Sequence, residues 1–167
     1  YKRQMGPLAE LPLERITGAW RGMEAPITGY FGDGSKWGVA IEYLEEEKPL
    51  GTAGALGLFD VDAIGGPLLM MNGDLVTRLD FGQLLDYHAV QCGSATMCVR
   101  EYDFQIPYGV VQGDGIRVRE ITEKPVQKFF VNAGIYVLEP EFIAQCKGDR
   151  AEDMPDLLRA TVHEGGK

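Results

Sequence analysis

The chain has little positive charge for its length of 167 residues. Lys and Arg number 16 against 25 Asp and Glu, which gives a formal net charge of −9 and a pI near 4.7. This balance predicts no DNA or RNA partner, because a polyanion needs a basic surface. A small nucleotide is still compatible, since Mg²⁺, backbone amides and one or two lysines can bind it.

Long hydrophobic runs are also missing. No apolar stretch approaches the ~20 residues that a membrane-spanning helix needs. No basic region followed by an apolar stretch opens the chain, as a secretory signal would require. The hydrophobic content of 45% and the charged content of 25% are ordinary for a soluble domain. We therefore expect a cytoplasmic protein with no membrane partner.

Cysteine and histidine are too few and too scattered for a metal site. Cys92, Cys98 and Cys146 are odd in number and lack a Cys-x-x-Cys spacing, so we expect buried thiols in a reducing compartment. His88 and His163 are isolated, and each lies in a predicted helix. A packed or surface role is therefore expected for both.

Strand and helix patterns alternate along the chain without a repeat or a linker. This alternation predicts an α/β fold with a mainly parallel sheet flanked by helices, over a single domain. The apolar run 67–71 predicts a strand that is covered on both faces. The other predicted strands cover residues 15–20, 39–43, 95–99, 108–112, 116–121 and 129–138, and the predicted helices begin near residues 55, 81, 140 and 154.

The glycine-rich segment Pro49-Leu50-Gly51-Thr52-Ala53-Gly54-Ala55-Leu56 joins a strand pattern to a helix pattern. Glycines at such a junction let backbone N–H groups approach a flat or anionic ligand that a Cβ would hold away. The alternative is a junction that only turns the chain. The ligand-binding interpretation becomes stronger only if other polar residues of the chain indicate the same ligand.

Asp74 directly follows the apolar strand 67–71, after Asn72 and Gly73. In an open α/β sheet the carboxyl ends of strands border the ligand crevice. A carboxylate oxygen beside small residues suits Mg²⁺, which takes one or two protein carboxylates together with water and phosphate oxygens. The alternative is an aspartate that caps a helix or stabilises a turn.

Further polar residues lie in the second half of the chain. The Glu123-Lys124 pair before Pro125 can offer a carboxylate to sugar hydroxyls and an ammonium group to a phosphate, or it is an exposed charge pair. Asn132 interrupts the apolar run 129–137, where a polar group without partners would cost roughly 1–3 kcal/mol. A ligand contact and an internal hydrogen bond both remain open for Asn132.

Gly109 offers a ligand a backbone surface without a side chain, or it is an ordinary hairpin glycine.

Six short strings occur in an order that resembles the sugar-1-phosphate nucleotidyltransferases, and among these the mannose-1-phosphate guanylyltransferases and their relatives. The strings span residues 30–35, 49–56, 71–74, 108–111, 123–125 and 131–136. Each string is weak evidence by itself, whereas six in order are strong. The resemblance implies a Rossmann-like mixed, mainly parallel sheet of the nucleotide-diphospho-sugar transferase type.

The resemblance also implies a reaction. An oxygen of a sugar 1-phosphate attacks the α-phosphorus of an NTP and pyrophosphate leaves, with Mg²⁺ as cofactor. The expected substrates are GTP and mannose 1-phosphate or a related hexose or amino sugar, and a homo-oligomer is possible. Alignment of two anionic substrates and neutralisation of their charge would supply the acceleration.

Site residues follow from the resemblance position by position. Asp74 is the expected metal ligand, and Lys124, the second catalytic residue, is the expected contact to the sugar phosphate. The expected nucleotide contacts are Glu46, Gly51, Thr52, Ala53 and Gly73, and the expected sugar contacts are Gly109, Glu123 and Asn132. A carboxylate at Glu46 would accept from the N1–H and N2–H groups of guanine, although Glu45-Glu46-Glu47 is also an ordinary solvated run. We expect residues 74, 124 and 132 to converge on one cavity above the turn at 51–53.

Two elements of the family pattern are missing from the sequence. Neither a G-x-G-T-R loop followed by Pro-Lys nor an Asp-Ile-Gly string occurs in it. We therefore expect residues 1–167 to be the central and sugar-binding part of one incomplete domain, with little or no turnover alone. A non-catalytic homologue that binds a nucleotide sugar is one alternative. A glycosyltransferase is another, with Asp60-Val61-Asp62 as its metal site, although a surface turn suits that string better.

Overall fold

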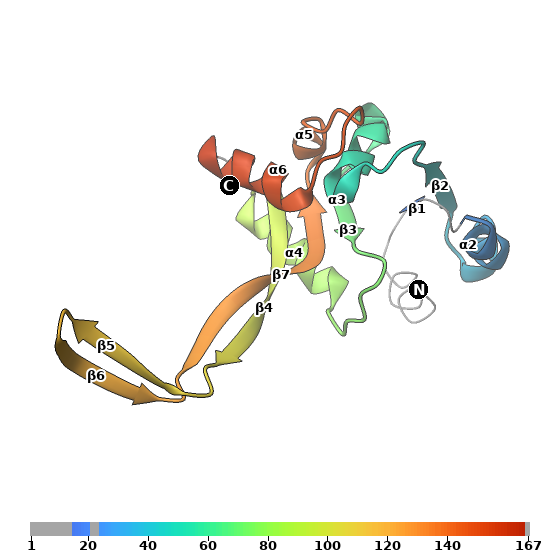
Figure 1. Ribbon diagram of the computed structural model, residues 1–167. Helices are drawn as coiled ribbons and strands as arrows, with labels where there is room; N and C mark the ends of the chain where they lie inside the picture. The colour runs from blue at the N-terminus through green and yellow to red at the C-terminus, as the bar shows by residue number, and fades with distance from the viewer. Residues whose placement is uncertain (1–14, 21–23, 166–167) are drawn as a thin grey trace. The chain divides into compact units, whose positions relative to one another are not determined.

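The computed structural model describes residues 15–20 and 24–165, which form two compact units (Figure 1). The main unit contains the residues up to Thr96 and those from Tyr136 onward, and the hairpin unit contains Met97–Ile135. No helix in the described part of the chain is long and apolar enough to cross a membrane.

Helices and strands alternate as far as the strand that begins at Ala95, and from there four strands follow one another along the chain before the next helix, as the predicted strands also do. The strands are β1 (Ile16–Trp20), β2 (Ile41–Glu45), β3 (Leu68–Met71), β4 (Ala95–Gln105), β5 (Gly109–Asp114), β6 (Arg117–Glu123) and β7 (Val126–Leu138). The α-helices are α2 (Glu24–Phe31), α3 (Gly51–Gly54), α4 (Phe81–Gln91), α5 (Pro140–Ile143) and α6 (Met154–His163), and the 3₁₀ turns are η1 (Ser35–Trp37), η2 (Ala55–Leu58) and η3 (Val61–Ala63). The described strands form a parallel β1-β2 pair, a sheet of order β3-β7-β4 and an antiparallel β5-β6 hairpin.

The turn between α2 and β2 is built on glycine and a carboxylate. Gly34 has a φ of +84°, and a Cβ there would lie 2.5 Å from the carbonyl oxygen of Val39, so only glycine fits. Asp33 Oδ1 accepts hydrogen bonds from the N–H (3.0 Å) and the hydroxyl (2.7 Å) of Ser35. These two bonds lower the pKa of Asp33. The string at 30–35 thus has a local structural role.

Helix α4 begins where the sequence predicts. The Asp80 carboxylate caps the helix by accepting from the Gln83 N–H at 3.0 Å. Cys92, with a left-handed φ of +50°, closes the helix. Cys92 is exposed and Cys98 is half-buried, so the prediction of three buried thiols is correct only for Cys146.

The core lies in the main unit and is centred on the end of β7. Its buried residues are Ala53, Leu56, Tyr136, Leu138, Phe142, Ile143, Cys146, Met154 and Leu157. All four residues of β3 are only half-buried, so the prediction of a strand covered on both faces is wrong for 67–71. β3 lies at the edge of the β3-β7-β4 sheet, whereas β7 is its central strand. The final residues of β7, from Gly134 to Leu138, are the buried run.

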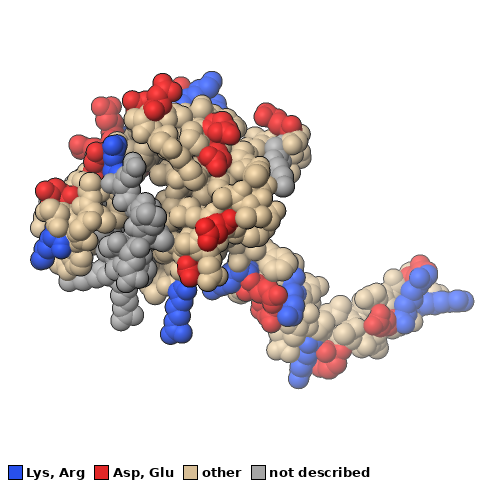
Figure 2. Space-filling model, turned by 180° about the vertical axis from the view of Figure 1, so that it is seen from behind, with Lys and Arg blue, Asp and Glu red and all other residues tan. Residues whose placement is uncertain are grey.

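The hairpin unit confirms the two strands predicted at 108–112 and 116–121, which pair as the antiparallel hairpin β5-β6. Asp114 pairs with Arg117, and Gly115 takes a φ of +62° in the turn between them. A register shift between Gln112 and Gly113 marks a β-bulge. The unit carries five basic and five acidic residues, which interleave along its surface (Figure 2).

Candidate functional site

The glycine-rich turn at 49–54 is shaped by its contacts with a distant segment. The chain forms only a single turn of helix, α3, and then the 3₁₀ turn η2, rather than the longer helix that the pattern after Gly54 predicts. Gly51 has a φ of +75°, and a Cβ there would lie 2.6 Å from the carbonyl oxygen of Glu152. Glycine is therefore required at position 51 for both its backbone angle and its lack of a side chain.

Backbone hydrogen bonds hold this turn against residues that follow α5. The Leu50 carbonyl accepts from the Glu152 N–H at 2.8 Å. The Glu152 carbonyl accepts from the N–H groups of Ala53 at 2.9 Å and Gly54 at 3.2 Å. A nucleotide base would have to share the Ala53 donor with Glu152. Sequence reasoning missed Glu152, since no local signal connects positions a hundred residues apart.

Thr52 is tied to the same segment through both its backbone and its side chain. Its N–H donates to Asp153 Oδ1 at 3.2 Å, and its hydroxyl lies 3.4 Å from the same oxygen. The Thr52 hydroxyl oxygen also accepts from the Met154 N–H at 2.8 Å. The predicted base contacts of Thr52 and Ala53 remain predictions, and both of these N–H groups already have protein partners.

Glu46 lies at the end of β2 and is half-buried, unlike an ordinary solvated glutamate. Its Oε2 accepts from the Leu50 N–H at 3.1 Å, which holds the start of the glycine-rich turn. Lys48 donates to the Asp149 carbonyl, so a second side chain links the turn to the same distant segment. Glu46 is therefore placed beside the turn that the sequence singles out.

A cavity of about 560 Å³ opens between the turn and this segment. It is lined by Pro49, Gly51, Arg150, Ala151, Glu152, Asp153 and Asp156. Its volume is in the range of small-molecule sites. Arg150 forms an ion pair with Glu152 at 3.3 Å, which leaves the lining predominantly acidic. Carboxylates repel phosphate, so this cavity suits a donor-rich group better than an anionic one.

Asp74 stands at the carboxyl end of β3 with its side chain exposed. Among the described residues it forms no ion pair and no side-chain hydrogen bond, whereas Asp80 serves as the cap of α4. No group of three His, Cys, Asp or Glu in the described ranges could hold a metal ion. A single carboxylate still fits Mg²⁺, which takes its remaining ligands from water and phosphate.

The hairpin unit brings three of the predicted residues together. Gly109 and Glu123 are directly paired across β5 and β6, and a Cβ on Gly109 would lie 2.9 Å from Glu123 Oε2. The carboxylate therefore lies over bare backbone. Lys124 follows with a φ of +46°, and its N–H donates to the Tyr108 carbonyl at 3.3 Å. The Gln105 side chain donates to the Lys124 carbonyl at 3.4 Å and holds this bend further.

Asn132 lies on β7 with an exposed side chain. Its Oδ1 accepts from the Gly134 N–H at 2.8 Å, so the internal hydrogen bond left open by the sequence is present. A ligand contact from Asn132 is still a prediction.

The predicted site residues divide between the two units. Those at 46, 51–53 and 73–74 belong to the main unit, and those at 109, 123, 124 and 132 belong to the hairpin unit. The expectation that residues 74, 124 and 132 line one cavity stays a prediction.

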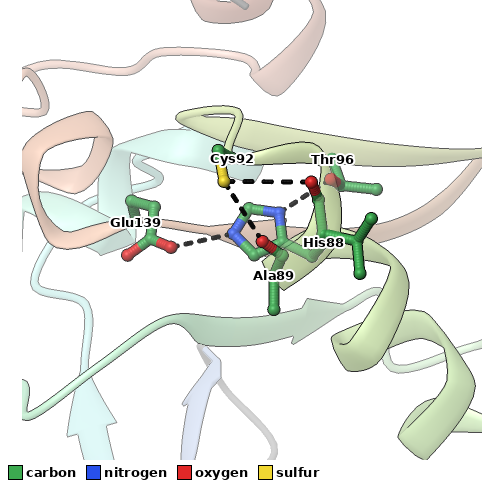
Figure 3. A network of polar contacts seen from close by, with 6 residues as sticks. His88, Ala89, Cys92, Thr96 and Glu139 are labelled. Carbon is green, nitrogen blue, oxygen red and sulfur yellow. Dashed lines mark hydrogen bonds and ion pairs between the residues drawn. The ribbon is translucent and has the colours of Figure 1, made fainter.

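His88 is the one buried polar residue of the described core, and it links three elements (Figure 3). Its Nδ1 lies 2.7 Å from the Thr96 hydroxyl at the start of β4. Its Nε2 lies 3.0 Å from Glu139 Oε1, directly before α5. The packed role predicted for His88 is confirmed, and His163 lies exposed at the end of α6.

Comparisons with known sequences point to one family. The family described as "Nucleotidyl transferase" matches residues 23–165. "Probable mannose-1-phosphate guanylyltransferase 1" from Oryza sativa subsp. japonica is 36% identical over 137 residues, which cover 77% of this chain and 36% of the relative. "Mannose-1-phosphate guanyltransferase" from Pichia angusta is 35% identical over 115 residues, which cover 65% of this chain and 32% of the relative. The chain thus spans about a third of the length of these curated relatives.

Solved structures share the fold. The crystal structure of HddC from Yersinia pseudotuberculosis complexed with GMP-PN has a TM-score of 0.63 and 22% identity, and it covers 90% of this chain and 67% of that chain. A UDP-glucose pyrophosphorylase complexed with UDP-glucose has a TM-score of 0.62 and 13% identity, with 98% and 74% covered. At these identities the likeness establishes the α/β fold of the chain.

Proposed function

Since the chain belongs to the nucleotidyl transferase family, we propose that the protein containing it joins a sugar 1-phosphate to a nucleoside triphosphate and releases pyrophosphate. The proposed substrates are GTP and mannose 1-phosphate or a related hexose or amino sugar. The names of relatives that are 35–36% identical support this choice. Both compact units belong to one domain in this proposal, because the family match runs through both of them.

In the main unit, Asp74 would hold Mg²⁺ at the carboxyl end of β3. When bound, Mg²⁺ would offset the negative charge of the phosphates. The turn at Gly51–Ala53, with Gly73, would lie against the nucleotide. The Glu46 carboxylate would accept from the N–H donors of guanine, and it is already fixed beside the turn by the Leu50 N–H.

In the hairpin unit, Lys124 would contact the sugar phosphate through its ammonium group, which forms no ion pair with any other described residue. Glu123 would accept from sugar hydroxyls, and Asn132 would offer its amide to another hydroxyl. Gly109 has no side chain, which leaves room for the Glu123 carboxylate to lie over its backbone. The observation that carries the proposal is this pairing of Gly109 with Glu123, directly before the bent and anchored Lys124.

We also propose that the protein acts in the cytoplasm and forms a homo-oligomer, as the thiol content and the family resemblance suggest. Size-exclusion chromatography with light scattering would measure the oligomeric state.

The decisive experiment uses the whole protein, with pyrophosphate release as the readout. We expect release only when Mg²⁺, an NTP and a hexose 1-phosphate are all present, and the highest kcat/KM with GTP and mannose 1-phosphate. Each of the four NTPs should be tested with several hexose 1-phosphates. Binding of a GDP-sugar without turnover would favour the non-catalytic alternative, and the absence of both binding and turnover would contradict the proposal.

A further inference from the structure

The glycine-rich turn and helix α6 exchange their helix caps. Asp153 precedes α6 but forms no side-chain hydrogen bond to that helix, although aspartate at this position commonly accepts from its own first turn. Its Oδ1 instead accepts from the Thr52 N–H in α3 at 3.2 Å. The first N–H of α6, on Met154, donates to the Thr52 hydroxyl oxygen at 2.8 Å. Each helix start is therefore satisfied by a side chain of the other.

Three hydrogen bonds connect Met154, Thr52 and Asp153 in one continuous chain, which we call the relay. The Thr52 hydroxyl has a single hydrogen, which points toward Asp153 Oδ1 at 3.4 Å while the oxygen accepts from Met154. Bonds to a carboxylate are the stronger kind, because the acceptor is charged. The same Oδ1 lies 2.8 Å from where a Cβ on Gly51 would be, so the carboxylate lies directly against the left-handed residue of the turn.

Neither partner belongs to the packed core. Thr52 and Asp153 are both exposed, whereas Ala53 and Met154 beside them are buried. Water can therefore satisfy the freed groups when this relay is cut, while the core contacts persist. The relay is thus suited to setting a local conformation rather than to holding the fold.

We propose that Asp153, acting through Thr52, is a positioning residue for the nucleotide-binding turn. It fixes the backbone at Gly51–Ala53 in the conformation from which the base is contacted. This inference rests on the proposed function of that turn. The sequence gives no hint of it, because 101 residues separate Thr52 from Asp153.

The test compares the kinetics of whole-protein variants. Asp153→Ala should raise the KM for GTP about tenfold, on the scale of one hydrogen bond to a charged group, and should leave the KM for the sugar 1-phosphate within about twofold. Thr52→Val removes the two hydroxyl bonds but keeps the bond from the Thr52 N–H to Asp153, so it should raise the KM for GTP less than Asp153→Ala does, and Thr52→Ser should keep near wild-type values. The double variant Asp153→Ala/Thr52→Val should raise the KM for GTP by less than the product of the two single effects, because the two substitutions share the bond from the Thr52 hydroxyl to Asp153. Asp149→Ala, an exposed aspartate of the same segment, is the matched control and should change neither KM.

A second readout does not depend on activity. The Thr52 amide in this chain should exchange its hydrogen at least about tenfold faster in Asp153→Ala than in the wild type and in Asp149→Ala, as measured by NMR. An unchanged GTP KM in an active enzyme would overturn the proposal, and so would equal increases in both KM values. If the wild type has no activity, the proposed function fails, and unchanged Thr52 exchange would separately overturn the positioning role.

Discussion

Several polar side chains in the described part of the chain bond to the nearby backbone. Asp33 accepts from Ser35, Asn132 from Gly134 and Glu46 from Leu50, each within four residues of itself. Short carboxylate and amide side chains reach these N–H groups without help from the rest of the fold. Such contacts can be anticipated from sequence. Asp74 differs, because its carboxylate has no such bond among the described residues.

The first prediction concerns replacement of the Asp74 carboxylate. Asp74→Asn in the whole protein should lower kcat at least ~100-fold, because it removes a main electrostatic contact to the proposed metal. Steady-state pyrophosphate release would measure the loss. Asp86→Asn, an exposed aspartate on α4, is the control and should behave as wild type. Equal activity of the two variants would remove Asp74 from the proposed metal site.

The three thiols should differ sharply in reactivity. Burial, with a contribution from the Glu152 charge, raises the pKa of Cys146 to about 11, and burial also raises the pKa of Cys98. Cys92 is exposed. At pH 8.5 iodoacetamide should therefore label Cys92 first, and Cys146 only after unfolding, since the thiolate is the nucleophile. Mass spectrometry of labelled peptides would show the order, and early labelling of Cys146 would contradict it.

The same shift has a consequence for stability. The folded state holds the Cys146 proton to higher pH than the unfolded state, whose thiol ionises near 9. The stability that this tighter proton binding gives to the folded state is present in full below pH 9 and is lost as the pH rises through 11.

The observed bounds of helices and strands agree best with the predicted bounds where nearby residues determine them. Helix α6 begins at Met154, with Pro155 in its first turn, and ends at His163, as predicted. The hairpin at Gly113–Gly115 is also where its turn residues place it. Strand β4 continues to Gln105, well beyond its predicted end at residue 99, and β7 begins at Val126 rather than at residue 129, because strand pairing rather than local sequence decides where an extended segment ends.

His88 supports the junction of α4, β4 and α5. His88→Leu should lower the free energy of unfolding by about 2–4 kcal/mol, because Thr96 and Glu139 lose a hydrogen-bond partner within or beside the core. His163→Leu removes an exposed histidine and should change it by less than about 0.5 kcal/mol. Urea titrations of this chain would measure both. Similar losses in the two variants would mean that the His88 contacts contribute little.

Gly57 allows close approach of η2 and the segment after α5. A Cβ at position 57 would lie 2.0 Å from the backbone nitrogen of Gly148, so Gly57→Ala must push two backbones apart. We expect a loss of about 1–3 kcal/mol, seen as a lower Tm. At Gly65 a Cβ would have nothing within 4 Å, and Gly65→Ala is the matched control. A Tm unchanged by Gly57→Ala would show that the two segments separate easily.

At the scale of the whole molecule, charge is unevenly divided between the units. The hairpin unit has equal numbers of acidic and basic residues, so the excess of nine negative charges belongs to the rest of the chain. The hairpin unit also carries most of the large exposed apolar side chains, among them Tyr108, Ile116 and Phe130. Charge repulsion between copies of the chain is therefore expected to arise from the residues outside the hairpin unit.

This distribution predicts a sharp dependence of solubility on pH. The chain should be least soluble near pH 4.7, where protonation of carboxylates removes the net charge and exposed apolar groups can associate. Turbidity of the purified chain from pH 3 to 8 would measure this, and a minimum above pH 7 would contradict it.

The sequence by itself determined which segments form most of the helices and strands, where α4 and α6 begin, and the family, because each depends on residues close together or on short strings in a fixed order. Only the tertiary structure decided that β7 rather than β3 is the buried strand, and that residues 150–154 hold the turn at 49–54. The reason is physical: burial depends on a strand's place in its sheet, and a contact across a hundred residues exists only once the chain has folded.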